Sequence, residues 1–232
     1  MAPISTAIFP EGGERLDDPS DPRTNEKRER ILRAALEVCA QRGVAAARME
    51  EIAARAGVSK GTLYRFFESK EDLLLATILA SYERGRMYVD ADLQDARDPR
   101  DLLARLCNGL TDVLVQVGAH ARVHYQAWGI TASTPASEAK LLAFMRAFHA
   151  ERDQMIEDLI RAGQDAGLFR RDVQPRVVAD AVTALLSGFI YRATFDPRAA
   201  SREALRACFD SLVRGFLEQP VCATEATRSE PR

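Results

Sequence analysis

Helical periodicity is the feature of this sequence that most constrains its fold. Between about residues 24 and 218, apolar residues recur at spacings of three and four, and no segment keeps the two-residue alternation of a strand. Glycine, proline and capping residues divide this stretch into about nine helical segments. They span about residues 24–42, 49–56, 59–67, 69–82, 98–117, 122–128, 136–166, 175–195 and 201–218. We therefore predict an all-α protein.

Local signals mark where several of these helices begin and end. Ser59 is placed to cap the third helix, and residues 69–72 have the spacing of a capping box. Gly57 suits a left-handed turn after the second helix, and Gly167 suits a Schellman-type end of the longest helix. Pro175 suits the first turn of the next helix. These signals support the predicted helix boundaries.

The composition is that of an ordinary globular protein, with 47% hydrophobic and 28% charged residues. No stretch approaches the roughly 18 uncharged apolar residues that a membrane span requires. The N-terminus lacks the basic region and apolar core of a signal peptide, so we expect a cytoplasmic protein without a membrane partner. The four cysteines are far apart, which favours reduced, packed thiols over a zinc module or a disulfide framework.

Charge is distributed unevenly along the chain, although the net charge is only −2. Residues 24–70 contain ten basic and six acidic side chains, so this segment carries +4 and the rest of the chain carries −6. A locally basic domain on an acidic body has the electrostatics that attract phosphates. Residues 1–23 are rich in proline with little apolar periodicity, and we expect them and residues 219–232 to be disordered tails.

The sharpest motif spans about residues 47–66 and has the spacing of a helix-turn-helix. Ala53 is small enough for two helices to cross closely, and Gly57 permits the turn between them. The apolar residues expected to fill the angle between the helices are Ile52, Val58, Leu63 and Phe66. The third helix would then enter the major groove with its N-terminal residues, which are Ser59, Lys60, Gly61, Thr62, Tyr64 and Arg65. The alternative is a tight helical corner with solvated charges.

The same run resembles the DNA-binding domain of tetracycline-repressor-like (TetR/AcrR) regulators over about residues 24–82. The matching residues are Ile31-Leu-x-Ala-Ala-Leu, Arg42-Gly43, Ile52-Ala53, Gly57-Val-Ser-Lys-Gly-Thr-Leu-Tyr64 and Phe67-x-Ser-Lys70-Glu-x-Leu73-Leu74. The resemblance implies a helix-turn-helix domain over residues 24–84 and an effector-binding and dimerisation domain over residues 85–218. It also implies a ligand-responsive repressor that binds a palindromic operator in double-stranded DNA as a homodimer, with no enzymatic activity and no cofactor.

Roles for single residues follow from this resemblance. It implies that Lys60, Gly61, Thr62 and Arg65 face bases or nearby phosphates, that the Tyr64 hydroxyl meets the DNA backbone, and that Lys70 contacts phosphate. Where the family usually has a Ser or Thr cap for the second helix, this chain has Arg48. Arg48 is expected either to reach a phosphate or to lie in solvent.

The C-terminal region resembles the family only in its helix pattern. Side chains that could line a pocket for a small apolar effector are Cys107, His124, Tyr125, Trp128, Phe144, Phe148 and Phe189. The last two helices are apolar on more than one face, which favours burial against both the chain's own core and a partner. The predicted dimer contacts are Val178, Val182, Leu186, Phe189, Phe209, Leu212 and Phe216, with burial inside one chain as the alternative.

Other classes of function find little support in the sequence. His120 and His124 are four residues apart and could chelate a metal, but no carboxylate or cysteine lies near them in the sequence, so no metal site is predicted. The sequence has no Gly-rich phosphate loop or nucleophile elbow, so no catalytic residue is predicted. A helical adaptor whose third helix binds protein remains an alternative, and it would bind without the steep salt dependence of phosphate contacts.

Overall fold

The computed structural model describes residues 22–131 and 135–217, and in these residues the chain forms helices and no strand, which confirms the all-α prediction. The helices are α1 (Pro22–Arg42), α2 (Met49–Ala56), α3 (Lys60–Phe66), α4 (Lys70–Leu93), α5 (Pro99–Gly118), α6 (Ala121–Thr131), α7 (Pro135–Asp165), α8 (Pro175–Ala193) and α9 (Arg202–Phe216), with a short 3₁₀ helix η2 (Pro197–Ala200) before α9. None of these helices is long and apolar enough to cross a lipid bilayer.

The main differences from the predicted helices are two boundaries and one additional short helix. α1 begins at Pro22, inside the predicted N-terminal tail, because a proline fits the first turn of a helix. α4 continues to Leu93, past the predicted domain boundary at residues 84/85. η2 was not predicted, because its four residues are too few to show a periodicity. Residues 1–21 and 218–232, which include most of both predicted tails and Cys222, lie outside the described residues.

The predicted capping serines make the expected bonds, but the capping box at residues 69–72 forms only one of its two bonds. The Ser59 and Ser69 hydroxyls accept the backbone N–H groups of Thr62 and Asp72, at 3.0 and 3.1 Å. The Asp72 carboxylate accepts the N–H of Glu68 at 3.2 Å, so it bonds one residue before the capping serine. At Gly167, φ is 71°, and the N–H groups of residues 167 and 168 bond to the carbonyls of residues 164 and 163, as in a Schellman motif.

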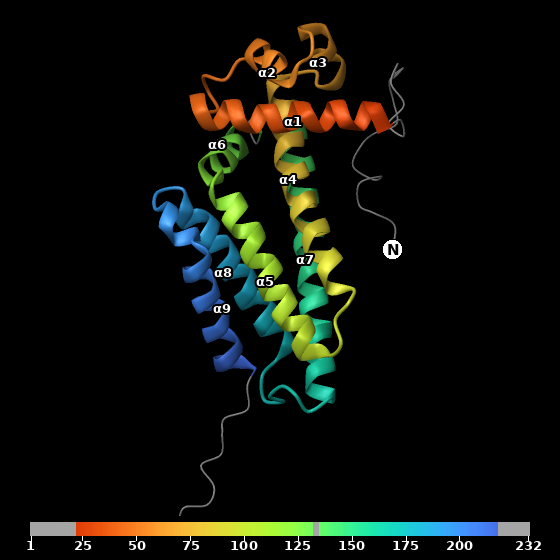
Figure 1. Ribbon diagram of the computed structural model, residues 1–232, viewed down its shortest axis with the longest axis vertical. Helices are drawn as coiled ribbons and strands as arrows, with labels where there is room; N and C mark the ends of the chain where they lie inside the picture. The colour runs from red at the N-terminus through yellow and green to blue at the C-terminus, as the bar shows by residue number, and fades with distance from the viewer. Residues whose placement is uncertain (1–21, 132–134, 218–232) are drawn as a thin grey trace, which may run out of the picture.

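Two hydrophobic cores lie one below the other along the molecule. In Figure 1, α2 and α3 lie on one side of α1, and α5, α8 and α9 lie on the other side. The upper core contains residues of α1, α2, α3 and α4. Residues of α6 and of the first turns of α7 complete it, including Val123, Ala127, Leu141 and Phe144. The lower core is made by α5, α8, α9 and the C-terminal half of α7, together with Val89 and Leu93 of α4. Both cores therefore include α4 and α7.

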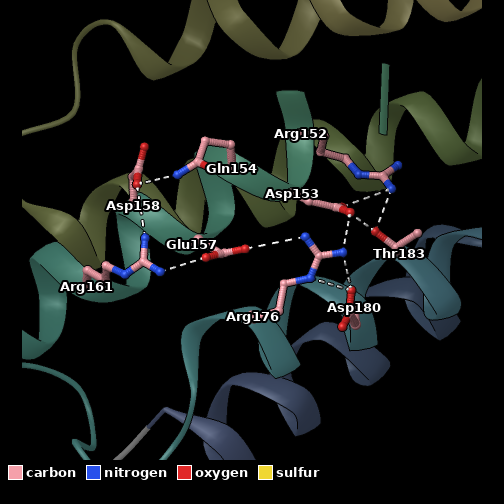
Figure 2. Close-up of polar contacts among 9 residues, drawn as sticks. All are labelled: Arg152, Asp153, Gln154, Glu157, Asp158, Arg161, Arg176, Asp180 and Thr183. Carbon is pink, nitrogen blue, oxygen red and sulfur yellow. Dashed lines mark hydrogen bonds and ion pairs between the residues drawn. The ribbon is translucent and has the colours of Figure 1, made fainter. Parts of the chain in front are cut away.

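Buried charges join α7 to α8 at the level of the lower core (Figure 2). Asp153 and Glu157 on α7 are 6% and 8% exposed. The Thr183 hydroxyl donates to Asp153 at 2.7 Å, and the Arg152 guanidinium donates to the Thr183 oxygen at 2.6 Å. Arg176, at the start of α8, lies 3.6 Å from Asp153 and 3.5 Å from Glu157. These contacts give each buried carboxylate a cationic or hydroxyl partner, as burial of charge requires.

Candidate DNA interface and effector region

The corner between α2 and α3 has the packing that the motif predicts. Ile52 and Leu63 are fully buried, and Val58 and Phe66 are partly buried against the same core. Gly57 adopts φ of 67°, and its N–H and that of the next residue bond back to carbonyls of α2. Because an L side chain is strained at this φ, glycine lets the chain turn here. The inner face of α3 is thereby fixed and its outer face is presented to solvent.

The outer face of α3 carries most of the predicted DNA-binding residues. Ser59, Lys60, Gly61, Tyr64 and Arg65 are exposed, and Thr62 is half-buried. Tyr64 keeps 43% of its surface exposed, which is a large fraction for an aromatic residue. A Cβ atom added at Gly61 would meet only the Ser59 hydroxyl, at 3.9 Å. The fold itself therefore leaves space for a side chain at Gly61, which fits a glycine that serves close approach of a partner.

Ser59 and Lys70 have partners inside the domain, whereas Arg48 makes no capping bond. Ser59 Oγ lies 2.9 Å from Thr62 Oγ1 as well as capping α3. Lys70 Nζ donates to the Ala45 carbonyl at 2.9 Å, across the turn before α2. Arg48 occupies the N-cap of α2 with φ of −108° and makes no side-chain capping bond, so the cap is missing as the sequence predicts.

Lys60 has an acidic partner that the sequence analysis did not identify. Its Nζ lies 2.5 Å from Glu50 Oε1, and the two side chains are 58% and 56% exposed. The same Nζ lies 5.8 Å from the centre of the Tyr64 ring. The hydrogen bond between the pair lowers the pKa of Glu50 and raises the pKa of Lys60. Because the two residues belong to different helices, no helical spacing in the sequence reveals the pair.

Three of the seven predicted effector residues come together around Tyr82 of α4, and a fourth packs against the same core. The rings of His124, Phe144 and Phe148 lie next to that of Tyr82, and Trp128 is partly buried against the upper core. The ring centre of Tyr82 lies 6.3 Å from that of His124, 6.2 Å from that of Phe144 and 5.2 Å from that of Phe148. We call Tyr82, His124, Phe144 and Phe148 the aromatic cluster. Tyr82 was missed because it shows in the sequence only as an apolar residue of a long helix.

The other three predicted effector residues lie elsewhere. Cys107 and Phe189 belong to the lower core, where burial raises the pKa of the Cys107 thiol to about 12. Tyr125 is 46% exposed, and its ring packs against that of Tyr191 on α8, with centres 5.8 Å apart. Cys107 and Phe189 therefore lie in the other core, and Tyr125 lies at the surface beside α8.

His124 is the titratable member of the aromatic cluster. Its side chain is buried, and desolvation, with smaller contributions from His120 and Arg84, lowers its pKa to about 4. The imidazole is therefore neutral at pH 7. A small cavity beside it lies between α1, α4 and α6 and is also lined by Leu36, Cys39, Thr77 and Ile78. Within residues 22–131 and 135–217, no three His, Cys, Asp or Glu side chains gather into a metal site.

The predicted dimer contacts are mostly covered by the chain itself. Val178, Val182, Leu186, Phe189 and Phe209 are buried in the lower core, Leu212 is partly buried there, and the Phe216 side chain lies outside the described part of the chain. A partner would have to contact other side chains of α8 and α9. The exposed residues between the charged ones are Val177, Ala184, Ser187, Gly188 and Tyr191 on α8 and Ala207, Ser211 and Gly215 on α9.

Known proteins resemble this chain in both of its parts. In the transcriptional activator FasR of Mycolicibacterium smegmatis, 34% of 134 aligned residues are identical, over 57% of this chain and 59% of FasR. In the repressor KstR of Rhodococcus jostii, 43% of 68 residues are identical, over 29% of this chain and 32% of KstR. The chain thus spans less than two thirds of the length of these curated relatives. A transcriptional regulator of Saccharomonospora viridis, solved with choline, has a similar fold, with 25% identity, a TM-score of 0.68 and coverage of 84% of this chain and all of the other.

Two family profiles together match most of the chain. The profile of bacterial regulatory proteins of the tetR family matches residues 31–77, which contain the α2–α3 corner. The profile of the C-terminal region of BetI-type transcriptional repressors matches residues 99–218, which is more than half of the chain. The helix-turn-helix geometry and the helical C-terminal region agree with both matches, and the chain belongs to the tetR family of bacterial regulatory proteins.

Proposed function

We propose that this chain is a ligand-responsive repressor that binds a palindromic DNA operator as a homodimer in the cytoplasm. The observation that carries the proposal is α3, a short helix held at one end of the molecule with Lys60, Tyr64 and Arg65 exposed on its outer face. The family consists of regulatory proteins, which argues for a regulator rather than an enzyme. The BetI-type repressor profile of the C-terminal region favours repression over the activation that FasR performs.

The eight predicted residues divide into two groups in this proposal. Base edges in the major groove are read from the start of α3, where a side chain can reach the bases. Phosphates are held at the margins by Arg48 and Lys70, which precede and follow the corner. The full set is Arg48, Ser59, Lys60, Gly61, Thr62, Tyr64, Arg65 and Lys70.

A dimer places two such helices about one turn of DNA apart, so that they read the two halves of a palindrome. Its interface is the exposed face of α8 and α9, where small side chains allow helices to approach closely. A Cβ atom at Gly188 meets no atom within 4 Å in one chain. Gly188→Leu should therefore keep the fold but shift the protein to monomers in sedimentation experiments. The matched control is Gly129→Leu on α6, a position that is equally open.

The effector binds at the aromatic cluster in this proposal, because the cluster joins α4, α6 and α7 beneath the DNA-binding helices. A bound effector favours a conformation in which the two α3 helices are wrongly spaced for the operator, and release of most operator-bound protein requires a preference of several kcal/mol for that conformation. Trp128, the single tryptophan, packs against the same core and provides a fluorescence signal for a ligand screen. Choline belongs in that screen, because the Saccharomonospora viridis relative was solved with it and aromatic faces attract quaternary ammonium groups.

Selection from a randomised DNA library with the purified protein tests the proposal. The enriched duplex is then titrated by fluorescence anisotropy at several salt concentrations, with Lys60→Ala and Tyr64→Ala as test variants and Arg146→Ala, an exposed cation of α7, as the control. We expect a palindrome whose binding weakens with salt and with both test substitutions but not with the control. Failure of the folded dimer to enrich any sequence at low salt would favour the protein-binding adaptor instead.

A further inference from the structure

The Lys60–Glu50 pair places a carboxylate on the surface that would face DNA. Glu50 is the second residue of α2, where the helix N-terminus stabilises an acidic side chain. The positive charge of Arg48 also contributes to lowering the pKa of the Glu50 carboxylate. The acid therefore interacts with two cations that the proposed function assigns to DNA contacts. Its Oε1 lies 2.5 Å from Lys60 Nζ, so the pair competes with any contact of Lys60 to DNA.

This arrangement affects the approach of any duplex. If Lys60 keeps its partner, the Glu50 carboxylate approaches the phosphates together with the ammonium group and opposes binding. If Lys60 leaves Glu50 for a phosphate, the pair is lost and the carboxylate remains within reach of the DNA. In both cases Glu50 weakens attraction to the phosphate backbone, which is the same for every sequence. Base-edge contacts from α3 add affinity on the operator, but they do not remove this effect.

We propose that Glu50 is a positioning residue that restrains Lys60 and thereby weakens binding to operator and non-operator DNA alike. This inference rests on the proposed DNA-binding function. It gives Glu50 a role that neither its place in α2 nor the resemblance of the motif indicates. The pair is exposed, and exposed pairs contribute little to stability, so its removal leaves the fold intact.

The test compares Glu50→Gln with the wild-type dimer on two duplexes of equal length, the selected operator and a scrambled sequence. Binding is measured by anisotropy over a range of salt concentrations. Glu50→Gln should raise affinity for both duplexes by about 3- to 10-fold, because the sequence-independent attraction that it strengthens acts on each of them. For the scrambled duplex, the slope of the logarithm of the binding constant against the logarithm of the salt concentration should become steeper by up to about one. The reason is that Lys60 becomes available to a phosphate and displaces a counterion.

Glu51→Gln is the matched control, because it removes the same charge from the next position of α2. Glu51 pairs with Arg42 at 3.0 Å and has no contact with α3 among those described. In a Lys60→Ala background, Glu50→Gln should lose most of its effect, since the two residues are coupled. Equal gains from Glu50→Gln and Glu51→Gln would reduce the effect to net charge and overturn the inference.

Two further outcomes separate the inference from the proposed function. Unchanged or weaker scrambled-duplex binding by Glu50→Gln, with Lys60→Ala still impaired on the operator, would overturn the role of Glu50 and leave DNA binding standing. Absence of binding to any duplex by folded wild-type protein at low salt would overturn the proposed function, and the inference with it.

Discussion

At the scale of single residues, Arg48 leaves α2 without a side-chain cap. Its backbone has the extended conformation of an N-cap residue, yet its own side chain accepts none of the free N–H groups of the first turn. Arg48→Ser should raise the free energy of unfolding by about 1 kcal/mol, because a serine hydroxyl can accept one of these groups. Urea unfolding followed by circular dichroism measures the change. Equal stability of variant and wild type would mean that water already satisfies this helix end.

His124 gives the protein a pH-dependent stability. Its folded-state pKa of about 4 lies below the roughly 6.5 of an unfolded histidine. The unfolded chain therefore takes up a proton first, so the stability contributed by neutral His124 is complete above about pH 6.5 and is lost as the pH falls towards 4. Between pH 7 and pH 5 this loss amounts to about 2 kcal/mol.

The His124→Gln variant checks this pH dependence. We expect its free energy of unfolding to change less than that of the wild type between pH 7 and pH 5, even if the loss of the ring contact with Tyr82 lowers its stability at both pH values. The carboxylates of the protein titrate equally in both proteins and cancel in the comparison. Parallel pH profiles would show that another group dominates this range.

At the scale of elements, the C-terminal end of α7 depends on the absence of one side chain. A Cβ atom on Gly163 would lie 2.0 Å from the ring of Phe169, which is 3% exposed in the lower core. Gly163→Ala should lower the free energy of unfolding by about 1–3 kcal/mol, because the buried ring must move. Gly129→Ala is the control: its Cβ meets nothing within 4 Å, and it should stabilise α6 by about 0.5–1 kcal/mol. Thermal unfolding of both variants should therefore shift in opposite directions.

The helices and the DNA-facing corner could be predicted from sequence because their signals are local. Gly57, Ser59 and Gly167 each determine the chain's direction through contacts with residues close in sequence. The outward face of α8 could not be predicted in the same way. Both of its faces carry apolar residues, and only packing against α7 and the lower core decides that Val182 and Leu186 are buried in one chain. The Lys60–Glu50 pair was hidden for the same reason, since tertiary structure brings it together.

At the scale of the whole molecule, the upper core makes the DNA-binding helices depend on α6 and α7. Phe144 of α7 is 2% exposed in the same core as Ile31 of α1. Phe144→Ala should cost about 3–5 kcal/mol of stability, and it should also speed amide hydrogen exchange in α1, although the two residues are far apart in sequence. Unchanged exchange in α1 would indicate that the two regions open independently.

The shared upper core also limits how this protein can be recombined. A chimaera joined near residue 84 would cut through α4 and would separate Ile31 and Ile52 from Leu141 and Phe144, which complete their packing. Transplanting the helix-turn-helix onto another sensor would therefore leave an apolar face exposed unless the new α6 and α7 were repacked against it. For the engineer of biosensors, the transferable module is not the DNA-binding domain alone but that domain together with the helices that support it.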